Sequence, residues 1–157
     1  MRIIVISDSH GRRSSIDYAL QSHPDARHVF FLGDNVRDVE AIADYHTDRI
    51  FHIVTGNCDG DTMYPVTELC TVGGVKILYT HGHHHSVKYT TAPLLEAAKK
   101  AGVKIALYGH THIAKTEYID GIYIVNPGSI SLSREGGNSY AVIDITENGI
   151  MPIIVKT

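Results

Sequence analysis

Two histidines stand two positions apart at the end of a short apolar run in the second half of the chain. Residues 105–108 are apolar, Gly109 follows them, and His110 and His112 come directly after it. Such a run predicts a buried strand, and the glycine allows the backbone to turn sharply at its end. Imidazoles held there can bind two metal ions or two sides of one ion. Taken alone, such a pair most often belongs to a solvated loop.

The pair does not stand alone, because four other apolar runs end in residues that can bind metals. These are Asp8 and His10 after residues 3–6, Asp34 after residues 30–33, Asn57 after residues 53–56, and His81 after residues 77–80. Each has an ordinary structural alternative, such as N-capping for an aspartate or a turn for asparagine next to glycine. Five such coincidences in 157 residues favour one shared site.

The donor atoms of these residues indicate which metals the site would take. Imidazoles, carboxylates and one amide form a mixed nitrogen and oxygen set, and one carboxylate has two oxygens with which to bridge two cations. This set suits borderline ions such as Mn²⁺, Fe²⁺, Ni²⁺, Co²⁺ or Zn²⁺ better than an all-oxygen Mg²⁺ or Ca²⁺ cage. The thiolate cluster of a structural zinc site is missing.

For other polar residues, the neighbouring sequence gives less support for a role in the site. His83, His84 and His85 follow His81 closely and could form a solvated loop or a separate metal-binding tract. Five cations are interpreted as solvated loop residues rather than substrate ligands: Arg12, Arg13, Arg37, Lys88 and Arg134. The segment from Asn126 to Ser129 is interpreted as a rigid turn near the site.

The elements that must position these residues change character along the chain. In the first 55 residues, strands near 2–7, 28–32 and 50–54 alternate with helices near 15–22 and 36–45, the first capped by Ser14 or Ser15. This order predicts a parallel sheet with helical crossovers. A hairpin at 66–79, a helix at 91–101 ending at Gly102 and a strand at 103–108 follow. Strands near 115–118, 122–125, 140–145 and 150–155 are separated by turn signals typical of an antiparallel meander.

These halves predict two packed sheets with helices outside, in one domain over residues 1–157. Charged residues make up 20% of the chain and the net charge is −3, so no basic field favours nucleic-acid binding. We expect no stable nucleic-acid complex and no membrane span. Cys58 and Cys70 form no CxxC pair, and the chain begins without a signal peptide, so we expect a cytoplasmic protein.

The order D-x-H, G-D, G-N, H and G-H-x-H resembles that of the calcineurin-like metallophosphoesterases. Gly56-Asn57-Cys58-Asp59 and Asn126-Pro127-Gly128-Ser129 are similar to segments of the small YfcE-type phosphodiesterases. The resemblance implies a four-layer α/β/β/α sandwich of two mixed sheets flanked by helices, with the site at the edge of the sheets. It also implies hydrolysis of a small or nucleotide-like phosphodiester.

Transferred onto this sequence, the resemblance implies two metal sites that share one carboxylate. One metal would take Asp8, His10, Asp34 and His112, and the other Asp34, Asn57, His81 and His110. A hydroxide that bridges two such cations would supply the nucleophile. We expect Mn²⁺ or one of the borderline ions named above, and the catalytic set would be Asp34, Asn57, His81 and His83.

One position departs from the pattern of many larger relatives, which carry histidine directly after the asparagine. Here that residue is Cys58, and a thiol with an ordinary pKa near 8.5 is a poor proton donor compared with imidazole at neutral pH. Another group, such as His83, would have to protonate the leaving group. The alternatives are a scaffold protein of the retromer-subunit type, a phosphomonoesterase, a cyclic-nucleotide enzyme or a nuclease, and a homo-oligomer stays open.

Overall fold

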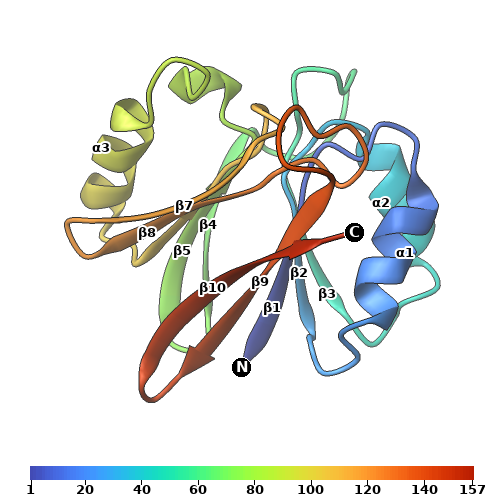
Figure 1. The fold of residues 1–157 in the computed structure, drawn as a ribbon, viewed down its shortest axis with the longest axis horizontal. Helices are drawn as coiled ribbons and strands as arrows, with labels where there is room; N and C mark the ends of the chain where they lie inside the picture. Colours follow the sequence, from blue (N-terminus) through green and yellow to red (C-terminus); the bar gives the residue numbers. More distant parts are fainter.

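The computed structural model describes all of residues 1–157 and contains two five-stranded sheets (Figure 1). The elements run in the order β1 (Arg2–Ile6), α1 (Arg13–Gln21), β2 (His28–Phe31), α2 (Val36–Ala43), β3 (Ile50–Ile53), β4 (Thr67–Val72), β5 (Val75–Thr80), the short 3₁₀ helix η1 (His83–His85), α3 (Ala92–Ala101), β6 (Ile105–Leu107), β7 (Ala114–Ile119), β8 (Ile122–Pro127), β9 (Ser139–Thr146) and β10 (Gly149–Lys156). None of the helices is long and apolar enough to cross a membrane.

Both sheets are mixed, as the sequence predicts. The first has the order β10-β9-β1-β2-β3, in which β1, β2 and β3 are parallel and the other pairings are antiparallel. The second has the order β4-β5-β6-β8-β7, in which β5, β6 and β8 are parallel. Helices α1 and α2 cover the first sheet and α3 covers the second, which gives the expected α/β/β/α sandwich (Figure 1).

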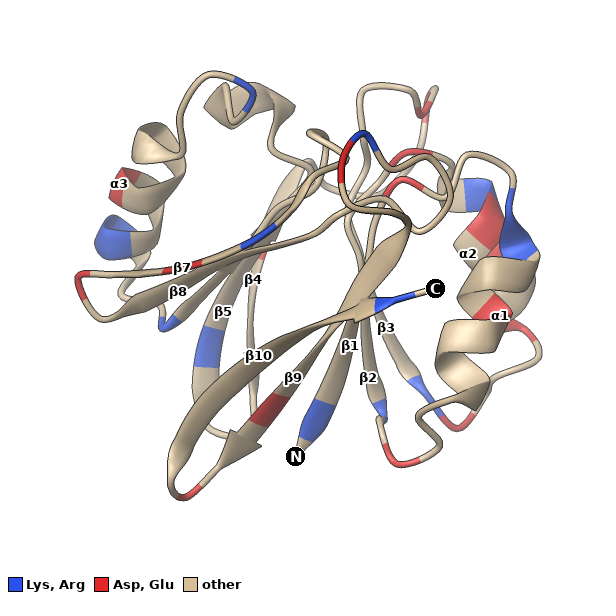
Figure 2. Ribbon diagram, in the orientation of Figure 1, with Lys and Arg blue, Asp and Glu red and all other residues tan.

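Three separate apolar clusters join the four layers. The cluster between the sheets includes Phe30 and Tyr79, and a second packs α1 and α2 against the first sheet. The third joins α3 to the second sheet through Leu94 and Ala98. Figure 2 shows that charged positions are sparse in the middle of the sheets and common in loops and helices. Apolar burial at these interfaces therefore holds the sheets rigid and leaves the loops at their edges to carry polar chemistry.

Two expectations are wrong, namely the cap of α1 and the single meander of the last four strands. Neither Ser14 nor Ser15 caps α1, because the helix begins at Arg13 and no side chain caps it. Asp38 fixes this end instead, since its carboxylate accepts the backbone N–H of Gly11 at 2.7 Å and the Arg13 Nε–H at 3.3 Å. Gly102 does end α3, with a left-handed φ of 65°, as the sequence predicts.

The last four strands do not form one meander. β7 and β8 make a hairpin in the second sheet, whereas β9 and β10 make a hairpin in the first. The chain crosses from one sheet to the other after β8, and this crossing is held by hydrogen bonds. The Ser129 Oγ–H donates to the Asp8 carbonyl at 2.7 Å, and the Ser139 Oγ–H donates to the Pro127 carbonyl at 2.7 Å. Turn signals identify hairpins but not the sheet that each one joins.

Candidate metal centre

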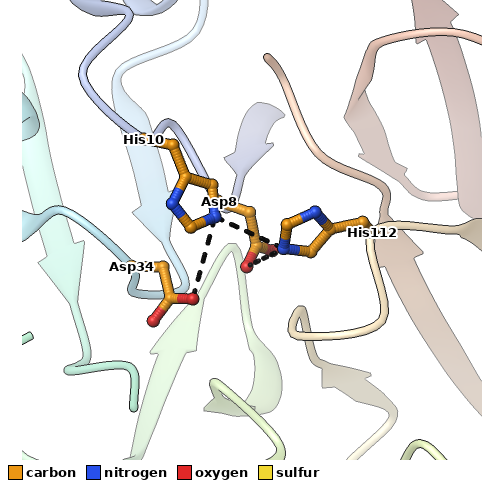
Figure 3. Close-up of side chains that lie close together, drawn as sticks. All are labelled: Asp8, His10, Asp34 and His112. Atoms are coloured by element: carbon orange, nitrogen blue, oxygen red, sulfur yellow. Dashed lines mark hydrogen bonds and ion pairs between the residues drawn. The ribbon is translucent and has the colours of Figure 1, made fainter. Parts of the chain in front are cut away.

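Four potential ligands from three loops meet at one edge of the two sheets. Asp8, His10, Asp34 and His112 each place a ligand atom within 4.8 Å of the others. His10 Nε2 lies 3.3 Å from His112 Nε2 and 3.8 Å from Asp34 Oδ2, and His112 Nε2 lies 3.2 Å from Asp8 Oδ1 (Figure 3). The four residues follow the carboxyl ends of β1, β2 and β6, which is where open α/β sheets bind their ligands.

A second group converges on the other oxygen of Asp34. His81 Nε2 lies 3.5 Å from Asp34 Oδ1, 3.1 Å from Asn57 Oδ1 and 3.1 Å from His110 Nδ1. Asp34 thus presents Oδ2 to the first group and Oδ1 to the second. Its carboxylate is also oriented by the Cys58 backbone N–H, which donates to Oδ1 at 2.9 Å. All seven residues that the resemblance implies as ligands are therefore brought together.

The protonation pattern leaves acceptor atoms facing one another. His81 Nδ1 lies 2.7 Å from the Leu32 carbonyl, and His112 Nδ1 lies 2.8 Å from the Leu132 carbonyl. Because a carbonyl can only accept, these nitrogens carry the proton, and in each neutral ring Nε2 is a lone pair aimed into the site. Asp8 Oδ1 is fully buried without a hydrogen-bond donor. Bound cations would remove the repulsion between the facing acceptor atoms and would give the unpartnered carboxylate oxygen a partner. The residues therefore fit a metal pair.

The pKa values of the site reflect burial and this crowding. Burial, followed by the nearby His81 and Lys88, lowers the pKa of His110 to about 4, so the ring stays neutral near pH 7. The hydrogen bond to Asp8 raises the pKa of His112 despite burial. Burial opposes ionisation of Asp8, yet contacts with His112, His81 and Ser7 outweigh it and lower the Asp8 pKa. The Asp8 carboxylate therefore favours the protonated His112 ring over the neutral one, and a bound cation would take the place of that proton.

Backbone conformation distinguishes the site in a way that the sequence does not reveal. Eight non-glycine residues have positive φ, and five of them are Asp8 (56°), His10 (42°), Asp34 (62°), His110 (68°) and His112 (60°). Left-handed conformations are uncommon outside glycine and cluster at functional sites, although Asp and His tolerate them better than most residues. The tight turns after β1, β2 and β6 bring these side chains together at the common edge of the two sheets.

Asp59 is a positioning residue whose role the sequence does not indicate. Its Oδ2 accepts the backbone N–H groups of Asp34 at 2.9 Å and Gly56 at 2.7 Å. Its Oδ1 accepts those of Asn35 and Val36, both at 2.8 Å. Asp34 is therefore not an N-cap of α2, because Asp59 satisfies that helix end from the following loop. One carboxylate thus ties together the loops that carry Asp34 and Asn57.

Asn126 performs a similar task for the histidine loop. Its Nδ2 donates to the Gly109 carbonyl at 2.9 Å and to Thr111 Oγ1 at 3.0 Å, and its Oδ1 accepts the Gly128 N–H at 2.9 Å. The side chain is fully buried. The expected turn over Asn126–Ser129 is wrong in part, because Asn126 and Pro127 are the last residues of β8, paired with β7. The Asn126 side chain nevertheless fixes the loop that carries His110 and His112.

The remaining predicted residues lie around this centre. The His83 ring centre is 5.4 Å from that of His81 and 6.1 Å from that of His110, and its buried Nδ1 lacks a hydrogen-bond partner. His84 is exposed. Cys58 is a largely exposed free thiol, and its partial desolvation together with the adjacent Asp34 raises its pKa to about 11.

Comparison with known proteins agrees with this geometry. Residues 1–148 match the calcineurin-like phosphoesterase superfamily domain. The chain belongs to this superfamily. Its relatives include the probable metallophosphoesterase YsnB of Bacillus subtilis, 33% identical over 92% of this chain and 85% of that protein. The phosphodiesterase MJ0936 of Methanocaldococcus jannaschii is 26% identical over 99% of this chain and 100% of that protein.

Solved structures of other proteins share the architecture. A predicted phosphoesterase from Streptococcus pneumoniae superimposes with a TM-score of 0.84 at 28% identity, over 99% of this chain and 88% of that one. Vps29 of Entamoeba histolytica, solved with Zn²⁺, has a TM-score of 0.75 at 22% identity, over 99% and 98% of the two chains. The second likeness shows a shared fold alone. As a member of this superfamily, the protein is a metal-dependent phosphoric ester hydrolase.

Proposed function

We propose that the protein is a dinuclear phosphodiesterase that hydrolyses small or nucleotide-like phosphodiesters. The observation that carries this proposal is the position of Asp34, whose two oxygens face two separate groups of donor atoms. A single metal would use only one of these groups and leave the other set of facing acceptors unrelieved. A shared anion is what two cations about 3.5–4 Å apart require.

The ligand assignment follows the two groups. Asp8, His10, Asp34 and His112 would hold one ion, and Asp34, Asn57, His81 and His110 the other. Mn²⁺ suits this mixed donor set, as do Fe²⁺, Co²⁺, Ni²⁺ and Zn²⁺. Two such ions, when bound, supply an acidified water and neutralise charge on the phosphoryl oxygens.

The chain's own residues have separate tasks. Carbonyl groups of Leu32 and Leu132 hold the rings of His81 and His112 in orientation, and Asn126 and Asp59 fix the loops on either side. His83 lies at the edge of the second group with a free ring nitrogen, where it would contact the ester and protonate the leaving oxygen. Burial and the nearby His81 lower the His83 pKa, which makes the protonated ring a stronger acid and leaves a smaller share of the rings protonated at neutral pH.

The test is turnover after metal exchange. Protein stripped with a chelator and reloaded with Mn²⁺ should hydrolyse bis(4-nitrophenyl) phosphate faster than 4-nitrophenyl phosphate, whereas Ca²⁺ should restore little activity. Asn57→Ala should lose this activity, and Asn148→Ala, in the exposed β9–β10 turn, is the matched control. A faster monoester would favour a phosphomonoesterase instead.

A scaffold role is the rival account, since Vps29 has the same fold. A site without a catalytic role would be free to lose ligands, yet all seven donor positions are filled in this chain. Absence of turnover with each of the five borderline ions, in protein that still binds them, would favour the scaffold.

A further inference from the structure

A pocket of about 610 Å³ adjoins the proposed metal centre on one side. Its walls come from the loop before α3 (Val87–Thr91), the start of β7, and the loop that contains Arg134. Thr111 also lines it, and this residue stands between His110 and His112 in the chain. A substrate whose phosphoryl group lies at the metal centre could therefore extend into this pocket.

The pocket carries more positive than negative charge. Lys88, Lys115 and Arg134 line it, with Glu117 as its one acidic residue. The Lys115 ammonium lies 3.1 Å from Glu117, so these two charges offset each other. The side chains of Lys88 and Arg134 are exposed and make no ion pair or hydrogen bond. Figure 2 shows the basic position in the loop that precedes α3.

A second pocket, lined in part by Cys58 next to Asn57, has the opposite charge balance. It measures about 840 Å³ and is lined by one cation, Arg37, together with Glu40, Asp59 and Asp61. An anionic extension of the substrate would be repelled there and attracted toward Lys88 and Arg134. An anionic extension of the substrate is therefore expected in the pocket lined by Lys88 and Arg134 and not in the second pocket.

An exposed aromatic ring lies among these cations. Tyr89 follows Lys88, lines the same pocket and is 91% exposed. A tyrosine with so little of its ring packed against the protein can serve as a stacking surface for a flat ligand. A nucleobase or similar ring beside a second phosphate would match both features.

We propose that this pocket binds the non-reacting part of the substrate and selects nucleotide-like esters that carry a further phosphate. The proposal rests on the phosphodiesterase site described above, because it assigns the pocket to that site's substrate. It names the two cations as the specificity-determining residues. It also gives a role to Lys88 and Arg134, which the sequence alone assigns to solvated loops.

Calorimetry on the Mn²⁺-loaded protein tests the proposal with thymidine 3′,5′-bisphosphate and thymidine 5′-monophosphate as probes. A ligand with two phosphates has two ways to place one at the metal centre, which alone lowers its Kd about twofold. We therefore expect the Kd of the monophosphate to exceed that of the bisphosphate by more than this factor. Lys88→Gln and Arg134→Gln should each reduce the ratio of the two Kd values by ~2- to 5-fold, as expected for exposed charge pairs. Added salt should reduce it further.

Matched controls are Lys104→Gln and Arg27→Gln, which remove exposed cations located before β6 and before β2 and should leave the ratio unchanged. A wild-type ratio within the statistical margin, or one that the two pocket variants leave unchanged, would overturn the proposal. Because the readout is binding, it is independent of turnover. Missing hydrolysis with an intact ratio would overturn the proposed activity and leave the phosphate pocket standing.

Discussion

Replacing Asp59 by asparagine is the sharpest test of how the site is positioned. The carboxylate accepts four backbone N–H groups, two on each oxygen, at 2.7–2.9 Å. An asparagine keeps one oxygen for two of these donors and turns an amide NH₂ toward the other two. The change in size is small, so the perturbation is confined to hydrogen bonding and the loss of one negative charge.

The cost follows from the two donors that lose their acceptor. A backbone N–H left without a partner costs about 1–3 kcal/mol, which gives about 2–6 kcal/mol for two. Asp59 is half-buried, so water can reach part of the loop and we expect a loss of about 2–3 kcal/mol in the free energy of unfolding. Loosening of the Asp34 backbone should also weaken metal binding.

Urea unfolding of metal-free protein measures the first effect, and calorimetric titration with Mn²⁺ measures the second. Asp61→Asn is the matched control, because Asp61 lies two residues away, is exposed and makes no hydrogen bond through its carboxylate. An Asp59→Asn variant that unfolds with the same midpoint as Asp61→Asn would refute the reasoning.

Three further outcomes are expected. His83→Ala should lower kcat ~10²- to 10⁴-fold, the usual contribution of a general acid, without changing bound metal, whereas His84→Ala should alter neither, and equal effects would contradict this. Cys58→Ala should change little, because a thiol with a pKa of about 11 is a weak acid, and Cys58→His should accelerate alkyl diesters more than aryl diesters only in the His83→Ala background; the plot of log kcat against leaving-group pKa decides, and a line that stays flat in His83→Ala would identify another donor. Burial lowers the pKa of His52 to about 4, below its ordinary value of about 6.5, so protonation favours the unfolded chain. The urea midpoint should therefore fall as pH drops from 7 toward 4, and His52→Phe should reduce that fall, which an unchanged pH dependence would refute.

The sequence predicts the sandwich and the ligand set because both depend on where apolar runs end. Parallel strands bring their carboxyl ends to one edge of each sheet, so polar residues after β1, β2 and β3 lie close together, as do those after β5 and β6. This reasoning requires only the position at which each strand ends, and the ends of the short apolar runs predict those positions. The family resemblance implies that these two edges form one site.

What it misses depends on contacts between segments that are distant in the chain. Asp59 caps a helix that begins 23 positions earlier, and a local search for caps finds only Ser14, Ser15 and Asp34. The crossing of the chain between sheets after β8 is fixed by Ser129 and its bond to Asp8, again at long range. The left-handed turns at the ligands leave no local signal, because Asp and His are acceptable in many conformations.

Counting the metal ions bound per chain tests the central claim most directly. Mn²⁺-loaded wild-type protein, analysed for metal content and by electron paramagnetic resonance, should contain two ions per chain whose spins are coupled. Asp34→Ala should lose the coupled signal and at least one ion, because it removes a ligand from both groups. One ion per chain in the wild type, or two coupled ions in Asp34→Ala, would contradict the shared carboxylate.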